Sequence, residues 1–306
     1  MMTNPPFFSV VLPSYNRAHL ISRPIASVVA QTFPSWELVV VDDGSTDNTR
    51  QVVESFTDAR IKYIFQKNQE RSAARNNGIA NALGRYICFL DSDDYFLPER
   101  LQRLYNYLNT EQFPVAFYYT SKILEHPDGK REVCDEKPLF GSVHDHVVAS
   151  TIHSQQVCAH RDVFQKHRFN PMFRIAEDTE LWLRIADDFK IEPLCQPTIV
   201  VMEHPERTIH GNTAGEMLQT VRYFLGKEHS GGKISRAKQK ELLSNCFFFI
   251  AKSYLLEKKR IRGLVFLLKA IAADAGHPQT KYRLHIAWKT LPLFKHSQLE
   301  ELIKGR

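Results

Sequence analysis

The chain has 306 residues and a mass of 35.4 kDa, with 43% hydrophobic residues and a formal net charge of +6. This length and apolar content predict one large domain with a full core and a smaller appendage. The five cysteines are scattered and form no Cys-x-x-Cys pair, which excludes the usual disulfide frameworks and zinc sites. The N-terminus has no signal-peptide pattern, and no apolar run approaches the roughly 18 residues of a membrane-spanning helix, so we expect a cytoplasmic protein.

Predicted strands and helices alternate over the first 110 residues. Strands are expected at 7–12, 36–41, 61–65 and 86–90, and helices at 21–31, about 47–56, 72–83 and 98–108. This order predicts a parallel, doubly wound α/β sheet, whose ligands bind at the carboxyl ends of the strands. Clusters of polar residues follow the strands at those ends.

The pattern changes after residue 113. Strands at 115–120 and 130–133 flank a Pro127-Asp128-Gly129 turn and predict a hairpin, which suggests an antiparallel insertion for a second substrate. A helix is expected at 180–186 and a strand at 198–203. Beyond them, Ser230-Gly231-Gly232 is the predicted linker, and further helices are expected at about 236–257, 261–273 and 280–290.

Residues 87–94 are the most informative segment of the chain. They read Ile-Cys-Phe-Leu-Asp-Ser-Asp-Asp, an apolar strand that ends in three carboxylates within four positions. Acids crowded at one strand end repel each other unless a cation compensates them, so the segment indicates a divalent metal held by oxygen ligands. The alternative is a solvated acidic loop without a metal.

The polar motifs together resemble those of the family 2 glycosyltransferases. They are Pro13-Ser14-Tyr15-Asn16-Arg17, Asp42-Asp43-Gly44-Ser45, Arg71-x-x-x-Arg75-Asn76-x-Gly78, Asp91-Ser92-Asp93-Asp94 and Glu177-Asp178 before Leu181-Trp182-Leu183-Arg184. Each motif is weak alone, but five in the same order are specific. The resemblance covers about residues 7–213 and implies the GT-A fold and a nucleotide-activated sugar as donor.

The resemblance also implies a domain plan. Residues 1–214 would form the GT-A catalytic domain, with a nucleotide-sugar half over about 1–112 and an acceptor half over about 113–214. Residues 215–306 would form a basic helical C-terminal region, because they hold 18 Lys and Arg against 7 Asp and Glu.

Several roles for single residues follow from the same resemblance. Asp43 would accept a hydrogen bond from the nucleobase, with Tyr15 near the ring, Asp42 supporting the loop and Arg71 beside the base or the phosphates. The implied nucleotide-sugar-binding set is Pro13, Tyr15, Asp42, Asp43, Arg71, Asp91 and Ser92. For Asp43 the alternative is a simple Asp-Gly turn, and for Arg71 a solvated surface arginine.

For the metal, the resemblance implies Mg²⁺ or Mn²⁺ with Asp93 as a direct ligand. Asp91 would contact the ribose, or the metal through water, and Asp94 could instead cap the following loop. His210 lies where many family members have a histidine that reaches the metal or the diphosphate. For His204 a surface role is the expected one.

The resemblance makes Asp178 the candidate general base and Glu177 its neighbour, and the alternative is a pair of acids that stabilise a helix N-terminus. An acceptor hydroxyl that loses its proton to Asp178 would displace the nucleoside diphosphate in one step and invert the anomeric centre. The Gln-x-x-Arg-Trp signature of processive synthases is missing. We therefore expect stepwise transfer, from a UDP-sugar, in polysaccharide, lipopolysaccharide or glycan assembly. A sugar-nucleotide nucleotidyltransferase and an inactive nucleotide- or carbohydrate-binding module are the alternatives.

The basic tail allows three interpretations. An apolar helical face of Leu243, Phe247, Ile250 and Tyr254 adjoins the cations Lys258, Lys259, Arg260 and Arg262. The tail could be a small helical cap, or it could dock on anionic lipids at the inner face of the membrane, where lipid-linked acceptors reside. Nucleic-acid binding is not expected, because no known binding motif accompanies the charge.

Overall fold

The computed structural model describes residues 5–134, 138–139, 141–150, 152–204, 214–226 and 233–290. The chain divides into two compact units, Met1–Pro205 and Glu206–Arg306. Both the expected boundary after residue 214 and the roles expected for the two parts stay predictions. The predicted linker at 230–232 and His210 lie outside the described residues.

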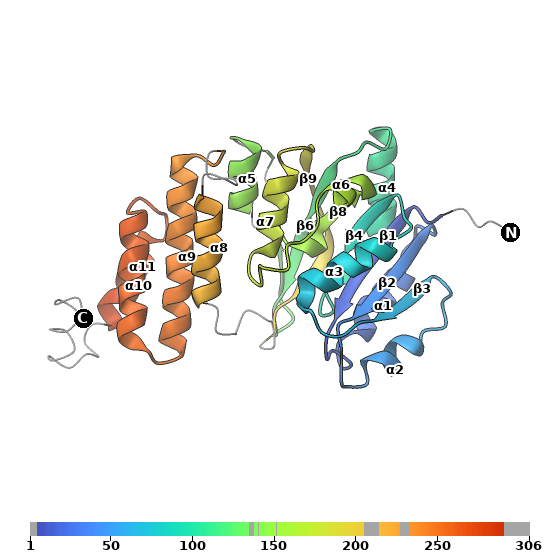
Figure 1. The fold of residues 1–306 in the computed structure, drawn as a ribbon, viewed down its shortest axis with the longest axis horizontal. Coiled ribbons are helices and arrows are strands. Elements are labelled where there is room, and N and C mark those ends of the chain that lie inside the picture. Colours follow the sequence, from blue (N-terminus) through green and yellow to red (C-terminus); the bar gives the residue numbers. More distant parts are fainter. Residues whose placement is uncertain are drawn as a thin grey trace. The chain divides into compact units, whose positions relative to one another are not determined.

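A mixed β-sheet forms the centre of the first unit, with the strand order β3-β2-β1-β4-β8-β6-β9-β5 and β7 beside β6 (Figure 1). The first four strands are parallel, as predicted. They are β1 (Phe8–Ser14), β2 (Trp36–Asp42), β3 (Ile61–Phe65) and β4 (Tyr86–Phe89). Helices α1 (Ser22–Val29), α2 (Thr49–Glu54) and α3 (Glu70–Asn81) connect them. Strand β2 is buried along its whole length, as expected for a Val- and Leu-rich strand inside a parallel sheet.

The other strands complete the sheet with mixed directions. Strand β8 (Val157–His160) pairs antiparallel with β4 and with β6 (Phe117–Glu125), and β6 forms the predicted hairpin with β7 (Arg131–Cys134). Strand β9 (Ile191–Met202) runs parallel to β6, and the short β5 (Tyr95–Phe96) pairs antiparallel with its end. The remaining helical segments are α4 (Arg100–Thr110), α5 (Val143–Ser150), η1 (Ser154–Gln156), α6 (Arg161–Lys166) and α7 (Glu177–Ile185).

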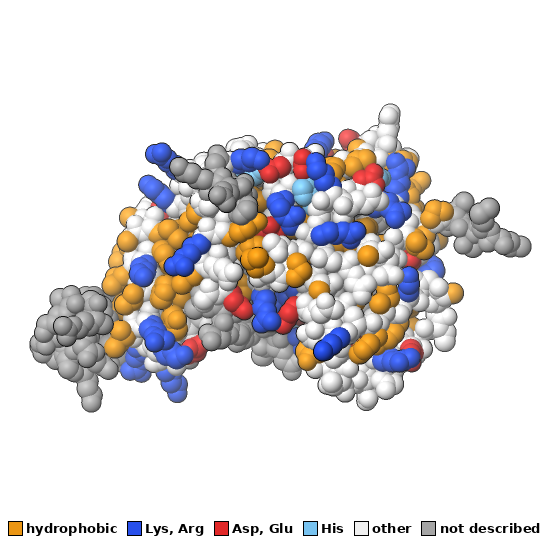
Figure 2. Space-filling view, in the orientation of Figure 1, with side chains coloured by type: hydrophobic (Ala, Val, Ile, Leu, Met, Phe, Trp, Pro, Cys, Tyr) orange, Lys and Arg blue, Asp and Glu red, His pale blue; other side chains and the backbone are white. Residues whose placement is uncertain are grey.

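The second unit is helical, as predicted, and its consecutive helices pack on one another. They are α8 (Ala214–Leu225), α9 (Arg236–Leu256), α10 (Arg260–Ala273) and α11 (Thr280–Thr290). In Figure 2, hydrophobic side chains and Lys or Arg side chains lie next to each other over this unit. No helix in the described part of the chain is both long enough and apolar enough to cross a membrane.

The apolar face predicted for α9 is used inside the second unit. Leu243, Ile250 and Tyr254 pack in one cluster with Val221 of α8, and the ring centroid of Phe247 lies 6.0 Å from that of Phe266 in α10. The cations Lys258, Lys259, Arg260 and Arg262, in contrast, are all exposed. The described surface at the α9–α10 junction is therefore cationic.

Gly78 brings helix α3 into close contact with strand β1. A Cβ atom added at Gly78 would lie 2.3 Å from Cγ1 of Val11, which is closer than real Cβ contacts. Gly78 closes the Arg71-to-Gly78 motif, so its small size fixes the distance between the sheet and the helix that carries both arginines of the motif.

We expect Gly78→Ala to lower the free energy of unfolding by about 1–2 kcal/mol, because overpacking outweighs the roughly 1 kcal/mol gain in helix propensity. Urea unfolding measures the change. Gly215→Ala in α8 is the matched control, since no atom of the described residues lies within 4 Å of the added Cβ and only the propensity gain remains. Equal stabilisation by both substitutions would contradict the packing role of Gly78.

Candidate active site

The first polar cluster lies where β1 and β2 end. Asp43 N–H donates to the Ser14 carbonyl at 2.8 Å, which joins the two strand ends. Asp42 accepts hydrogen bonds from Ser45 N–H at 2.8 Å and from the Tyr63 hydroxyl at 2.6 Å. These bonds match the expected role of Asp42 as the residue that supports the loop.

Asp43 is buried below that loop. Its Oδ1 accepts hydrogen bonds from Gln66 Nε2 at 2.6 Å and from Gln69 N–H at 2.9 Å. Burial raises the pKa of Asp43, and these hydrogen bonds oppose the rise. Tyr15 is 48% exposed on the neighbouring strand end, so its ring is available to a ligand. Pro13 is half-buried and aligned with Val41 in the last part of β1.

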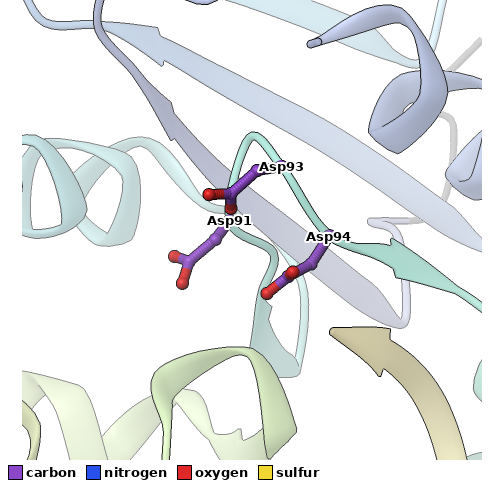
Figure 3. Close-up of side chains that lie close together, drawn as sticks. All are labelled: Asp91, Asp93 and Asp94. Atoms are coloured by element: carbon purple, nitrogen blue, oxygen red, sulfur yellow. The ribbon is translucent and has the colours of Figure 1, made fainter. Parts of the chain in front are cut away.

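The three acids that follow β4 form the second cluster. One carboxylate oxygen from each of Asp91, Asp93 and Asp94 lies within 4.8 Å of the others. Figure 3 shows the three side chains extending from the loop after β4 toward the same side. Ser92 lies between them in the chain and is half-buried.

Asp94 has a structural position that differs from those of its two neighbours. It is fully buried, and its carboxylate accepts hydrogen bonds from Gln155 Nε2 and from Met202 N–H, both at 2.9 Å. Those bonds tie the loop to η1 and to the end of β9. This geometry agrees with the expectation that Asp94 could serve the loop and not the metal.

Asp93 is paired with a histidine that the sequence analysis treated as a surface residue. His204 Nε2 lies 3.0 Å from Asp93 Oδ2, and the His204 side chain is only 20% exposed. Asp93 and His204 are 111 positions apart, and the sequence gives no signal for the pairing. His204, two residues after the end of β9, thus joins the candidate site residues, whereas His210 lies outside the described part of the chain.

Arg75 of α3 lies between the acids of β4 and those of α7. Its Nη2 donates to Asp91 Oδ1 at 2.9 Å, and its Nη1 donates to Glu177 Oε1 at 3.0 Å. The same Nη1 lies 3.5 Å from Asp178 Oδ1. Arg71, one turn earlier, is half-exposed and approaches Glu177 at 3.6 Å. The sequence analysis quoted Arg75 only as part of a motif and gave it no role.

Asn76 fixes the segment that leads to α7. Its Nδ2 donates to the Phe169 carbonyl at 2.8 Å, and its Oδ1 accepts from Phe169 N–H at 3.0 Å. Two reciprocal bonds from one amide hold a backbone segment in a single orientation. The Arg75-Asn76-x-Gly78 part of the motif therefore places both the arginine and the chain that precedes the candidate base.

Asp178 and Glu177 begin helix α7 but have different surroundings. Glu177 is buried against Arg75 and Arg71. Asp178 accepts a hydrogen bond from Ser154 N–H at 2.9 Å, while its Oδ1 accepts none from the described residues. Burial raises the pKa of Asp178 to about 7, with Glu177 and Asp91 adding to the rise and Arg75 opposing it. Its side chain is 20% exposed although Oδ1 itself is buried, so a ligand can meet only the exposed part of this side chain.

The residues around Asp93 are compatible with a divalent cation. Asp91 and Asp93 offer oxygen atoms from partly exposed carboxylates, with His204 beside them. Mg²⁺ and Mn²⁺ take few protein carboxylates and keep positions for water and phosphate oxygens. Asp94 contributes charge, but its bonds to Gln155 and Met202 hold it in the scaffold.

The comparisons with known proteins agree with this geometry. Residues 9–159 match the family model described as glycosyl transferase family 2. The fold and the carboxylate site together define a GT-A type of domain. This chain accordingly carries a family 2 glycosyltransferase domain.

Two curated relatives illustrate the range of similarity. An uncharacterized glycosyltransferase of Rickettsia conorii is 36% identical over 181 residues, which is 58% of this chain and 30% of that protein. The UDP-Glc:alpha-D-GlcNAc-diphosphoundecaprenol beta-1,3-glucosyltransferase WfgD of Escherichia coli is 47% identical over 95 residues, which is 31% of this chain and 38% of that protein. The chain thus spans well under half the length of either relative.

Two solved structures share the fold. Residues 1–349 of TarS from S. aureus superpose with a TM-score of 0.62 at 18% identity, over 98% of this chain and 92% of that chain. The mannosyltransferase PcManGT from Pyrobaculum calidifontis, in complex with GDP-Man and Mn2+, gives a TM-score of 0.53 at 18% identity, over 98% of this chain and 86% of that chain. At these identities the likeness shows the GT-A fold.

We expect Asp94→Ala to lower the free energy of unfolding by about 2–4 kcal/mol, because it leaves Gln155 and Met202 N–H without their buried acceptor. Asp93→Ala is the matched control and should change it by at most about 1 kcal/mol, as expected for a partly exposed pair with His204. Urea unfolding compares the two. Similar losses for both would contradict the structural role assigned to Asp94.

Proposed function

We propose that the chain is an inverting, non-processive glycosyltransferase that moves a sugar from a UDP-sugar to an acceptor hydroxyl. The observation that carries the proposal is Asp178, a partly exposed carboxyl at the start of α7 whose pKa near 7 suits a general base. Arg75 contacts both Asp178 and Asp91, so the base lies near the carboxylates expected at the donor diphosphate. An inactive binding module would have no need of such a base, and a nucleotidyltransferase would need a Gly-rich loop with a lysine after the first strand.

The donor would bind along the carboxyl ends of β1, β2 and β4. Asp43 and Tyr15 would contact the base, and Asp91 the ribose. Asp91, Asp93 and His204 would hold Mg²⁺ or Mn²⁺, which supplies positive charge for the diphosphate that leaves. His210 remains a candidate for the same role.

Asp178 would act on the acceptor. Its carboxylate takes the proton of an acceptor hydroxyl, and the hydroxyl oxygen attacks the anomeric carbon as the bond to the nucleoside diphosphate breaks. Attack opposite the leaving group inverts the anomeric centre, and no second nucleophile is required. Glu177 faces Arg75 and Arg71 instead of the acceptor in this scheme.

The names of similar proteins support UDP as the donor nucleotide and a lipid-linked acceptor. TarS has been solved in complex with UDP-GlcNAc, and the E. coli relative is named for UDP-Glc and a diphosphoundecaprenol acceptor. PcManGT holds GDP-Man, which keeps GDP as the competing nucleotide. We infer that this chain adds single sugars in the assembly of a polysaccharide or lipid-linked glycan.

We further propose peripheral contact with the anionic inner face of the membrane through the exposed cations of the α9–α10 junction. Lys258, Lys259, Arg260 and Arg262 are exposed there, and each basic residue near such a surface contributes about 1 kcal/mol of attraction. The packed apolar residues of α9 contribute no hydrophobic face to this contact.

The first prediction concerns nucleotide and metal. UDP should bind measurably only with Mn²⁺ or Mg²⁺ present, and more tightly than GDP, because the carboxylates repel a diphosphate without a cation. Isothermal calorimetry of the wild type and of Asp93→Asn, which should lose the metal-dependent binding, makes the comparison. Equal affinity in EDTA would rule out the metal role, and tighter GDP binding would rule out the choice of UDP.

The second prediction concerns the base. Asp178→Asn should slow transfer by about 10²-fold or more while donor affinity stays near that of the wild type. Because the base acts only when deprotonated and its pKa is about 7, the wild-type rate should fall as pH drops below about 7. Glu177→Gln is the matched control and should cost less. Rapid transfer by Asp178→Asn would move the assignment to Glu177.

The third prediction concerns the membrane. Wild-type protein should co-sediment with vesicles rich in phosphatidylglycerol, less so as salt rises, and not with phosphatidylcholine vesicles. Arg260→Glu with Arg262→Glu should abolish this binding, since acids are tolerated in the first turn of α10. Lys130→Glu with Arg103→Glu, at exposed positions of the first unit, is the charge-matched control. Equal binding by both double variants would exclude this docking surface.

A further inference from the structure

Arg75 contacts carboxylates of both halves of the candidate site. Asp91 follows β4 on the donor side, whereas Glu177 and Asp178 begin α7, and Arg75 reaches all three from α3. Its side chain is only 4% exposed. A guanidinium stays charged in proteins, so a buried positive charge stands at the centre of three acids.

We propose that Arg75 is a positioning residue that holds the donor-side carboxylate Asp91 and the base Asp178 in one arrangement. This inference rests on the proposed function and adds to it a residue that acts through others. The two carboxylates come from chain segments far apart in sequence, and Arg75 forms an ion pair with each of them.

The shape of the guanidinium suits this role. Two different nitrogens make the short hydrogen bonds, Nη2 to Asp91 and Nη1 to Glu177. Because the guanidinium is planar and rigid, it can hold both carboxylates in fixed directions at once. The Arg75 guanidinium carbon also lies 5.3 Å from the centroid of the Phe169 ring, in the segment that Asn76 fixes. A lysine ammonium would keep the charge, but as a point charge on a flexible stem it would not reproduce the fork.

The charge of Arg75 acts on Asp178 as well. The groups that face Asp178 are Arg75 from α3, Asp91 after β4, Glu177 on its own helix and the Ser154 N–H of η1. Of these groups, Arg75 and the Ser154 N–H favour the ionised form of Asp178. Without Arg75, the two acids Asp91 and Glu177 would be opposed by one N–H donor. An opposite charge at such distances lowers a carboxyl pKa by about 1–3 units, and this is the amount that removal of Arg75 would restore.

Two substitutions separate the charge of Arg75 from its shape, and a third serves as control. Arg75→Met removes both, and Arg75→Lys keeps only the charge. Arg174→Met removes a nearby arginine whose 3.1 Å pair with Glu70 is exposed and thus screened by solvent. Thermal unfolding establishes that each variant is folded.

Two readouts are measured on the full chain. The first is kcat for hydrolysis of UDP-glucose and UDP-N-acetylglucosamine with Mn²⁺. The second needs no activity: carbodiimide labels only protonated carboxyls, so peptide mass spectrometry across pH gives the midpoint at which Asp178 loses its proton.

The inference predicts a separate pattern for each variant. Arg75→Met should raise the labelling midpoint of Asp178 by about one pH unit or more and lower kcat by about 10²-fold. Arg75→Lys should keep the midpoint near that of the wild type yet lose at least about tenfold in kcat. Arg174→Met should change neither.

Other results would overturn the inference. They are wild-type kcat in a folded Arg75→Lys variant, or an unchanged midpoint in Arg75→Met. If Arg75→Met does not fold, the kcat of Arg75→Lys decides alone. A wild-type chain that binds UDP but neither hydrolyses nor transfers any sugar would instead contradict the proposed function, and the labelling midpoints would still test the charge of Arg75.

Discussion

The buried positive charge of Arg75 is the interaction on which the arrangement of the site depends. It can lie there because Gly78, one turn further along α3, lets the helix approach β1 closely. Asn76, which lies between Arg75 and Gly78 in the chain, holds the backbone at Phe169 by two hydrogen bonds. Residues 75–78 of α3 thus determine how closely the helix packs on the sheet and where the Arg75 guanidinium lies. They also determine how the chain runs toward α7.

The three acids after β4 show how a fold distributes like charges. Asp91 faces an arginine, Asp93 faces a histidine, and Asp94 is satisfied by uncharged donors in the interior. Because the compensation differs, the acids are not equivalent. Asp94 holds the loop in place, and the two partly exposed carboxylates are the ones proposed to bind a cation together with a ligand.

The sequence predicts the parallel half of the sheet well, because Val- and Ile-rich strands there alternate with amphipathic helices. Strand β8 is missed since Val157–His160 is too short to show a period, and the start of β9 is missed because Pro193 and Pro197 interrupt it. The acids of the site are also found from sequence, whereas the pairs that Arg75 and His204 form are not. Glu177 lies 102 residues from Arg75, and Asp93 lies 111 residues from His204, so sequence spacing gives no signal for these two pairs.

The end of strand β9 has a consequence for the rest of the chain. Met202 is bonded to Asp94 and His204 to Asp93 directly before the chain leaves the first compact unit. The loop after β4, which would contact the proposed donor, therefore also holds residues 202–204 at the end of the first unit. Ligand binding at the loop and attachment of residues 202–204 to it are linked, and such linkage is reciprocal. A ligand that changes the charge on the loop changes the free energy needed to detach residues 202–204. Tension on those residues in turn changes the affinity for the ligand.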